Sequence, residues 1–188
     1  MTSGNALLTN VRPMAGPITD VLILDGRFAA PGTAVPDGTQ TIDGLGCILA
    51  PGLVEAHTHL DKSLLGLPWY KNEVGPRLID KIDNERRVKV ALDIDPARQS
   101  ERQAILSAAK GSTHIRSHVD VDTEHGLKGI EGVMATRDKL RDLIMIELVA
   151  FPQSGLMIRS GTAELMDQAM QAGSEVVGGL DPCGIDRP

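Results

Sequence analysis

The sequence predicts an α/β protein in which a small β unit, residues 1–50, precedes about four βα units, residues 51–188. Short apolar runs and turns rich in Pro and Gly fill the first part, and no helical spacing interrupts them. In the second part, segments with the spacing of strands and of helices alternate. The second, third and fourth strands of that part begin about 30 residues apart, which is the usual size of a βα unit.

The first 50 residues are expected to form a β-sandwich-like unit from short strands. Residues 21–24, Val-Leu-Ile-Leu, have strand length, and Asp25-Gly26 directly after them is a strong hairpin signal. Residues 31–40 are dense in Pro and Gly and are predicted to be a loop. The other strands predicted in this unit are residues 6–8, 41–43 and 47–49.

The remaining residues are expected to alternate between strand and helix. Asp95 before Pro96 is typical of an N-cap followed by the first helical position, and Gly111 ends that helix. The near-continuous apolar run at 144–151 is typical of a strand buried on both faces. The predicted elements are strands at 53–56, 114–119, 144–151 and 175–180, and helices at 76–90, 96–110, 127–140 and from a capping Thr162 to Gly173.

Strands that are separated by helices should pair in parallel through right-handed crossovers. This order fits the first half of a TIM-type (β/α)8 barrel, whose full form needs about 250 residues. A four-stranded open sheet fits the same order, and the pattern does not separate the two.

The composition restricts the classes of partner and compartment. The formal charge of −6 argues against nucleic acid or an anionic membrane as the main partner, since both need a basic face. No apolar run approaches membrane-spanning length, and the N-terminus has no signal-peptide pattern. Cys47 and Cys183 are too few for a disulfide framework or a Cys-x-x-Cys metal site. A cytoplasmic location is therefore expected.

The stretch PGLVEAHTHLDK, residues 51–62, carries the main candidate site. In a strand, residues two positions apart point the same way, so His57 and His59 would present two imidazoles at one strand end. Neutral imidazole binds Zn²⁺ or Fe²⁺ well, and active sites collect at the carboxyl ends of parallel strands. A pair of exposed or hydrogen-bonded loop histidines is the alternative, but the preceding apolar strand favours a metal site.

This stretch resembles the first barrel strand of the amidohydrolase superfamily. More narrowly, the chain resembles the branch that holds bacterial cytosine deaminase and N-isopropylammelide amidohydrolase. The supporting stretches occur in the right order and spacing: THIRSHVDVD at 113–122, ELVAFPQSGL at 147–156 and GSEVVGGLDP at 173–182.

The resemblance implies roles for individual residues. His57 and His59 match the two metal ligands of the first strand, and EVVGGLDP lacks the lysine of binuclear sites, which favours one divalent metal ion, Zn or Fe. Gln153 matches a glutamine whose amide pairs with the edge of a pyrimidine or triazine ring. Leu78 lies near the place where the family offers a backbone group to that ring. Asp181 departs from cytosine deaminase and looks more like the isopropylammelide branch, which makes it a further substrate-binding candidate.

Two residues at the end of the second strand, His118 and Asp120, share a face and could support the metal ligands. Hydrogen bonding within the barrel mouth explains them equally well. For Asp61 a local structural role is favoured.

The resemblance places a third histidine ligand, a proton-shuttling glutamate and a metal-binding aspartate on the fifth and later strands, after Pro188. We therefore expect no catalytic residue within this chain, and little or no activity from it alone. Either these residues are the N-terminal portion of a longer enzyme, which is favoured, or they form a half-barrel that stands alone.

The activity expected from the resemblance is hydrolysis of an exocyclic C–N bond on a pyrimidine- or triazine-like ring, with a small N-heterocycle as substrate. Two alternatives remain open. One is a cyclic amidase that opens a ring amide. The other is a non-catalytic half-barrel that docks onto a partner chain, and the expected partner is a second copy or the remainder of the barrel.

Overall fold

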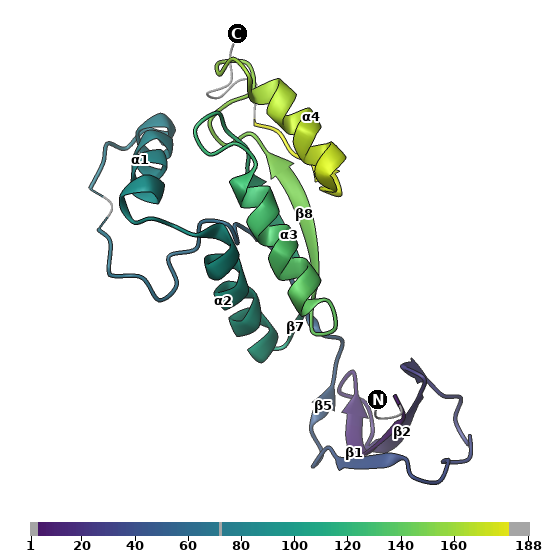
Figure 1. Cartoon of the computed structure of the whole chain (residues 1–188). Helices are drawn as coiled ribbons and strands as arrows, with labels where there is room; N and C mark the ends of the chain where they lie inside the picture. Colours follow the sequence, from purple (N-terminus) through teal and green to yellow (C-terminus); the bar gives the residue numbers. More distant parts are fainter. Residues whose placement is uncertain (1–3, 72, 181–188) are drawn as a thin grey trace. The chain divides into compact units, whose positions relative to one another are not determined.

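The computed structural model describes residues 4–71 and 73–180. The chain divides into two compact units, Met1–Pro51 and Gly52–Pro188, and each is a separate body with its own sheet (Figure 1).

The first unit is a five-stranded sheet. Its strands are β1 (Ala6–Pro13), β2 (Thr19–Leu24), β3 (Arg27–Phe28), β4 (Gln40–Asp43) and β5 (Ile48–Leu49). They run in the order β3-β2-β1-β4, and β5 also pairs with β1. β1 is antiparallel to β2 and parallel to β4 and β5.

The hairpin predicted at Asp25-Gly26 is confirmed. These two residues join the antiparallel strands β2 and β3, and their φ angles of 50° and 74° have the sign that a two-residue hairpin turn requires. The described residues of this unit form one sheet, not the two packed layers of a sandwich. Only Val11 and Leu22 among its described apolar side chains are buried, which is too little apolar surface to hold two layers together.

The second unit is a four-stranded parallel sheet with helical connections. Its elements are β6 (Leu53–Thr58), α1 (Leu78–Ala91), α2 (Pro96–Ala109), β7 (Ser112–Asp120), α3 (Lys128–Leu140), β8 (Met145–Phe151), α4 (Thr162–Ala172) and β9 (Val176–Val177). The sheet order β6-β7-β8-β9 follows the sequence, and each neighbouring pair is parallel. The predicted α/β class, with a small β unit before parallel β/α units, is confirmed.

The ends of the helices follow local chemistry, with one correction. The Asp95 side chain accepts hydrogen bonds from the backbone amides of Ala97 and Arg98, as predicted for an N-cap. At α4, Thr162 is the first helical residue and does not cap the helix; Gly161 takes the cap position with a φ of 93°. The left-handed conformation there suits a residue without a Cβ atom.

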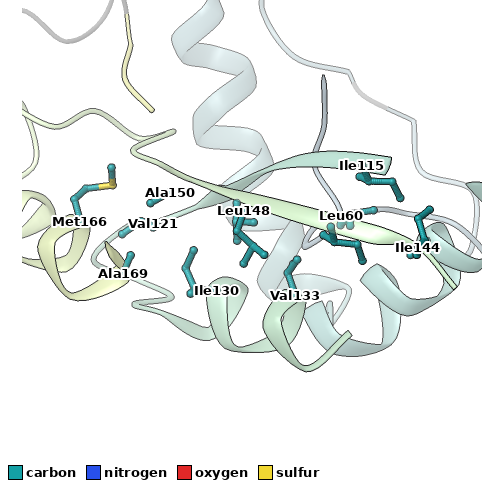
Figure 2. Packing of buried hydrophobic residues seen from close by; sticks show 13 residues of the cluster. Leu60, Ile115, Val121, Ile130, Val133, Ile144, Leu148, Ala150, Met166 and Ala169 are labelled. Atoms are coloured by element: carbon teal, nitrogen blue, oxygen red, sulfur yellow. The ribbon is translucent and has the colours of Figure 1, made fainter. Parts of the chain in front are cut away.

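The core of the second unit lies between the sheet and α3 and α4 (Figure 2). Figure 1 shows α2 and α3 side by side along this sheet. Leu60, directly after β6, is fully buried in the same cluster. The other members come from β7, β8, the residues next to these strands and the helices: Ala104, Ile115, Val119, Val121, Ile130, Val133, Ile144, Ile146, Leu148, Ala150, Met166 and Ala169.

The opposite face of the sheet is open within the described residues. Met145 is 63% exposed there, and a groove of about 450 Å³ runs along this face between residues that include Val54, Arg116 and Glu147. The prediction that residues 144–151 are buried on both faces is therefore wrong for the start of β8. Farther along the same face Val149 is buried, so the open part is the start of the strand.

Among the described residues, no helix is both long and apolar enough to cross a membrane.

Candidate metal centre

A register irregularity in β6 turns the two candidate ligands toward the open face of the sheet. Glu55 lies opposite Ile115 in β7, whereas Thr58 lies opposite Ser117, so β6 advances three residues while β7 advances two. Strict alternation would have placed His57 opposite Ser117, on the face that is buried against the helices. The extra residue instead brings His57 to the face of His118, as a β-bulge does when it re-aims a side chain.

Three imidazole rings meet at this end of the sheet. The ring centroids of His57 and His118 are 4.1 Å apart, and those of His59 lie 5.7 Å from His57 and 5.8 Å from His118. Phe151, at the end of β8, packs edge-on against His118 with centroids 5.5 Å apart. The structure therefore brings together the two predicted ligands and His118, at the carboxyl ends of neighbouring strands.

The surroundings favour the neutral form of His118. Burial lowers the pKa of His118, and the neighbouring His57, His59 and Arg116 lower it further. Neutral imidazole is the form that binds metal.

Asp120 is the centre of a buried network of charges next to His59. Its side chain is 2% exposed, and Oδ2 accepts hydrogen bonds from Nζ of Lys62 at 3.1 Å and Nζ of Lys89 at 2.9 Å. Oδ1 lies 3.6 Å from Nδ1 of His59, which is longer than a hydrogen bond. Lys62 also donates to Oε1 of Glu85 at 2.6 Å.

His59 and the two lysines keep Asp120 ionised in spite of its burial. Burial works to raise the pKa of Asp120, but His59 and the two ammonium groups hold it well below its usual range. Burial also works to lower the pKa values of Lys62 and Lys89, and the neighbouring carboxylates, Asp120 foremost, outweigh it and raise them. Both lysines are therefore charged at neutral pH.

Asp61 lies in the same network, but its pKa is raised, whereas that of Asp120 is lowered. Burial and the nearby charge of Asp120 raise the pKa of Asp61 to about 7. Its Oδ2 accepts a hydrogen bond of 3.2 Å from the backbone amide of Asp120. This contact ties the loop after β6 to the end of β7, which agrees with the local structural role favoured from the sequence.

A second contact fixes the segment that carries His59. The backbone amide of Leu60 donates to Oγ of Ser117 at 3.0 Å, and both residues are fully buried. The backbone directly after His59 is therefore anchored in the core.

The other predicted site residues differ in placement. Gln153 lies two residues after β8, at the same edge of the sheet, and its backbone amide donates to the carbonyl of Phe151 at 2.9 Å. Leu78 is the first residue of α1 and is 56% exposed. Asp181 lies outside the described residues.

The sequence reasoning missed Lys62 and Lys89. Lys62 directly follows Asp61 in the histidine stretch, so it could have been considered there. Lys89 lies near the end of α1, 31 positions from Asp120, and no spacing in the sequence signals their contact.

Known proteins resemble this chain in both fold and sequence. No family model matches the chain. N-isopropylammelide isopropyl amidohydrolase of Pseudomonas sp. (strain ADP) is 34% identical over 145 residues, which is 75% of this chain and 36% of that protein. The crystal structure of N-isopropylammelide isopropylaminohydrolase from Burkholderia multivorans ATCC 17616 has a TM-score of 0.89 at 45% identity, over 97% of this chain and 46% of that one.

A third likeness is to the crystal structure of 5-methylcytosine deaminase from Klebsiella pneumoniae liganded with 5-fluorocytosine. Its TM-score is 0.71 at 28% identity, over 92% of this chain and 43% of that chain. The chain thus belongs to the amidohydrolase superfamily, in the branch of N-isopropylammelide amidohydrolase and cytosine deaminase. It spans less than half the length of each of these relatives.

The described residues fit part of a metal centre but not a whole one. No group of three or more His, Cys, Asp or Glu side chains within residues 4–71 and 73–180 is arranged to hold a metal ion. Within the described part of the chain, the donor set consists of imidazoles at the ends of β6 and β7, and Nδ1 of His59 and Nδ1 of His118 are buried without a hydrogen-bond partner. A more distant structure of the same fold, atrazine chlorohydrolase from Arthrobacter aurescens TC1, is complexed with zinc and atraton (TM-score 0.60, 16% identity).

Proposed function

We propose that the protein to which these residues belong hydrolyses an exocyclic C–N bond on a pyrimidine- or triazine-like ring, with the help of one divalent metal ion. The observation that carries this proposal is the meeting of His57 and His59 at the carboxyl end of β6. Its support from relatives is that the names of two of them, N-isopropylammelide isopropyl amidohydrolase and 5-methylcytosine deaminase, describe such reactions.

In this proposal His57 and His59 supply two of the ligands for Zn²⁺ or Fe²⁺. Such an ion, when bound, makes water a nucleophile at neutral pH by lowering its pKa. The described residues lack a complete ligand set, so the remaining ligands come from outside them.

Gln153 is proposed to read the ring of the substrate. Its side-chain amide offers one acceptor and two donors, which matches the alternating edge of a pyrimidine or triazine. It follows β8 next to Phe151, and Phe151 packs against His118, so the glutamine and the histidines share one edge of the sheet. Leu78 and Asp181 stay as weaker candidates for substrate contacts.

The architecture of the second unit supports a place in the first half of a TIM-type barrel. Four parallel strands follow each other in order, helices cover one face, and the other face is open within the described residues. In such barrels the site lies at the carboxyl ends of the strands, which is where the three imidazoles meet.

Zinc binding by the whole chain tests the proposed metal centre. Calorimetric titration of the metal-free chain should give one Zn²⁺ per molecule, and His57→Ala and His59→Ala should each remove most of that affinity. His114→Ala is the matched control, because His114 lies near the other end of β7 and should leave binding unchanged. Zinc binding by the unaltered chain that persists unchanged in both ligand variants would exclude this centre.

A further inference from the structure

We propose that Asp120 is a positioning residue for His59, and that Lys62 and Lys89 hold its carboxylate so that one oxygen is reserved for this histidine. This inference rests on the proposed metal centre for its purpose, but its geometry can be tested without metal.

The two oxygens of Asp120 have different surroundings. Oδ2 accepts hydrogen bonds from Lys62 at 3.1 Å and from Lys89 at 2.9 Å. Oδ1 is buried, has no hydrogen-bond partner among the described residues and lies 3.6 Å from Nδ1 of His59. The lysines thus bind one oxygen and leave the other directed at the imidazole.

His59 offers the complementary atom. Nδ1 of His59 is also buried without a hydrogen bond in the described part of the chain. Two buried polar atoms without partners are unfavourable, and a contraction from 3.6 Å to about 2.8 Å would satisfy both of them at once. Such bonds are often long in a structure without its ligand and tighten when the site is filled.

The consequence is a choice of tautomer. When Nδ1 of His59 donates its proton to Asp120, Nε2 carries the free lone pair and is the atom available to a metal ion. In free neutral imidazole side chains the opposite tautomer, with the proton on Nε2, predominates. Asp120 is therefore expected to change the tautomer of His59 from Nε2–H to Nδ1–H.

The two lysines and the carboxylate that they hold come from different parts of the second unit. Lys62 lies in the loop after β6, Lys89 lies in α1, and Asp120 is the last residue of β7. Their hydrogen bonds fix the carboxylate in two directions. The amide of Leu60 bound to Ser117 fixes the backbone beside His59. The backbone contact constrains the position of the His59 ring, and the carboxylate of Asp120 constrains its orientation.

His57 provides an internal comparison. Its ring lies against His118, and within the described residues no carboxylate comes within 4.0 Å of its nitrogen atoms. The proposed effect of Asp120 should therefore be specific to His59.

The test is the nitrogen NMR spectrum of the imidazoles in the metal-free full chain, recorded at a pH above their titration. The unaltered chain should show His59 mainly as the Nδ1–H tautomer. A predominant Nε2–H tautomer in the unaltered chain would overturn the proposal, whether or not any variant folds.

Asp120→Asn is the variant that removes the negative charge and keeps the shape. It should shift His59 toward the Nε2–H tautomer and leave His57 unchanged. Asp122→Asn is the matched control, because Asp122 is equally buried and lies 3.6 Å from Lys89, but pairs with His125 instead of His59. An identical tautomer of His59 in a folded Asp120→Asn variant would contradict the proposal.

Zinc affinity links the two proposals and keeps them distinguishable. Loss of a partner that orients a metal-bound histidine typically costs about 10- to 100-fold in affinity, and this loss is expected in Asp120→Asn but not in Asp122→Asn. If zinc binding persists in His57→Ala and His59→Ala while the tautomer of His59 depends on Asp120, the metal centre fails and the positioning role stands. If zinc binding depends on His57 and His59 and the tautomer of His59 does not respond to Asp120→Asn, the metal centre stands and the positioning role fails.

Discussion

Asp122 differs from the other buried carboxylates near the histidines because backbone amides are its main partners. Its Oδ1 accepts hydrogen bonds of 2.9 Å from the amides of Glu124 and His125. Burial works to raise the pKa of Asp122, but these amides and the charge of Lys89 lower it below its usual value. The carboxylate therefore closes the turn after β7 in its ionised form.

Asp122→Asn should lower the free energy of unfolding by about 1–3 kcal/mol at neutral pH, because hydrogen bonds to a charged group are replaced by weaker ones. The folded-state pKa lies below the unfolded value, so the stabilisation by the carboxylate is present above about pH 4 and is lost as the pH falls through the folded pKa. The difference between variant and unaltered chain should therefore shrink in acid.

Urea unfolding at neutral pH and at about pH 3 measures the loss of unfolding free energy in the variant and its dependence on pH. Asp142→Asn, in an exposed turn before β8, is the control and should change neither. A difference for Asp122→Asn that stays constant across this range would contradict the assignment.

At the scale of single elements, β8 is open on one face at its start and buried on both faces near Val149. Leu148 points into the core and is fully buried, whereas Met145 lies on the open face and is 63% exposed. The apolar run of residues 144–151 gave no sign of this difference, because the sequence of a strand does not show what covers each of its faces.

Leu148→Ala should destabilise the chain by about 2–5 kcal/mol through lost burial and a residual cavity. Met145→Ala, on the opposite face of the same strand, should cost less than about 0.5 kcal/mol in the isolated chain, as exposed substitutions do. Urea unfolding of the two variants compares the faces directly. Equal costs for both would show that the open face is covered in solution.

The irregular register of β6 determines where the His57 side chain points. The extra residue of β6 between Glu55 and Thr58 brings His57 to the face of His118. A regular strand would have directed that imidazole toward the helices. The pair of histidines in sequence therefore meets its third partner only because the strand is not regular.

At the scale of the whole molecule, the second unit has one covered and one open face within the described residues. Arg116 and Glu147 form an ion pair on the open face, beside exposed apolar side chains such as Val54 and Met145. The chain covers 46% of the Burkholderia relative and 36% of the Pseudomonas relative. A second copy of this chain or the remainder of the barrel stays the predicted partner for this face.

The chain of 188 residues, purified and supplied with zinc, should release no amine or ammonia from an aminopyrimidine or an N-alkylaminotriazine above the buffer rate. The physical reason is that its described residues do not complete a metal site. Colorimetric detection of ammonia, with chromatography for amine release or ring opening, measures this. Turnover that disappears in His57→Ala would contradict the prediction.

The sequence by itself determined the features that depend on neighbouring residues. The hairpin at Asp25-Gly26, the N-cap at Asp95 and the parallel α/β order follow from short-range sterics, capping and apolar spacing. The same holds for the histidine pair, since two residues in one strand end are close in space whatever the rest of the chain does. The family resemblance added the expected roles of Gln153 and Asp181.

Only the tertiary structure decided which distant residues meet. The contact of Lys89 with Asp120 joins α1 to β7 across 31 positions, and that of Lys62 with Asp120 spans 58. The register shift in β6 likewise depends on its pairing with β7, and the open face of β8 depends on which elements pack against it. Burial is the reason that these contacts matter, because removal from water makes each of the charges depend on partners that local sequence patterns do not show.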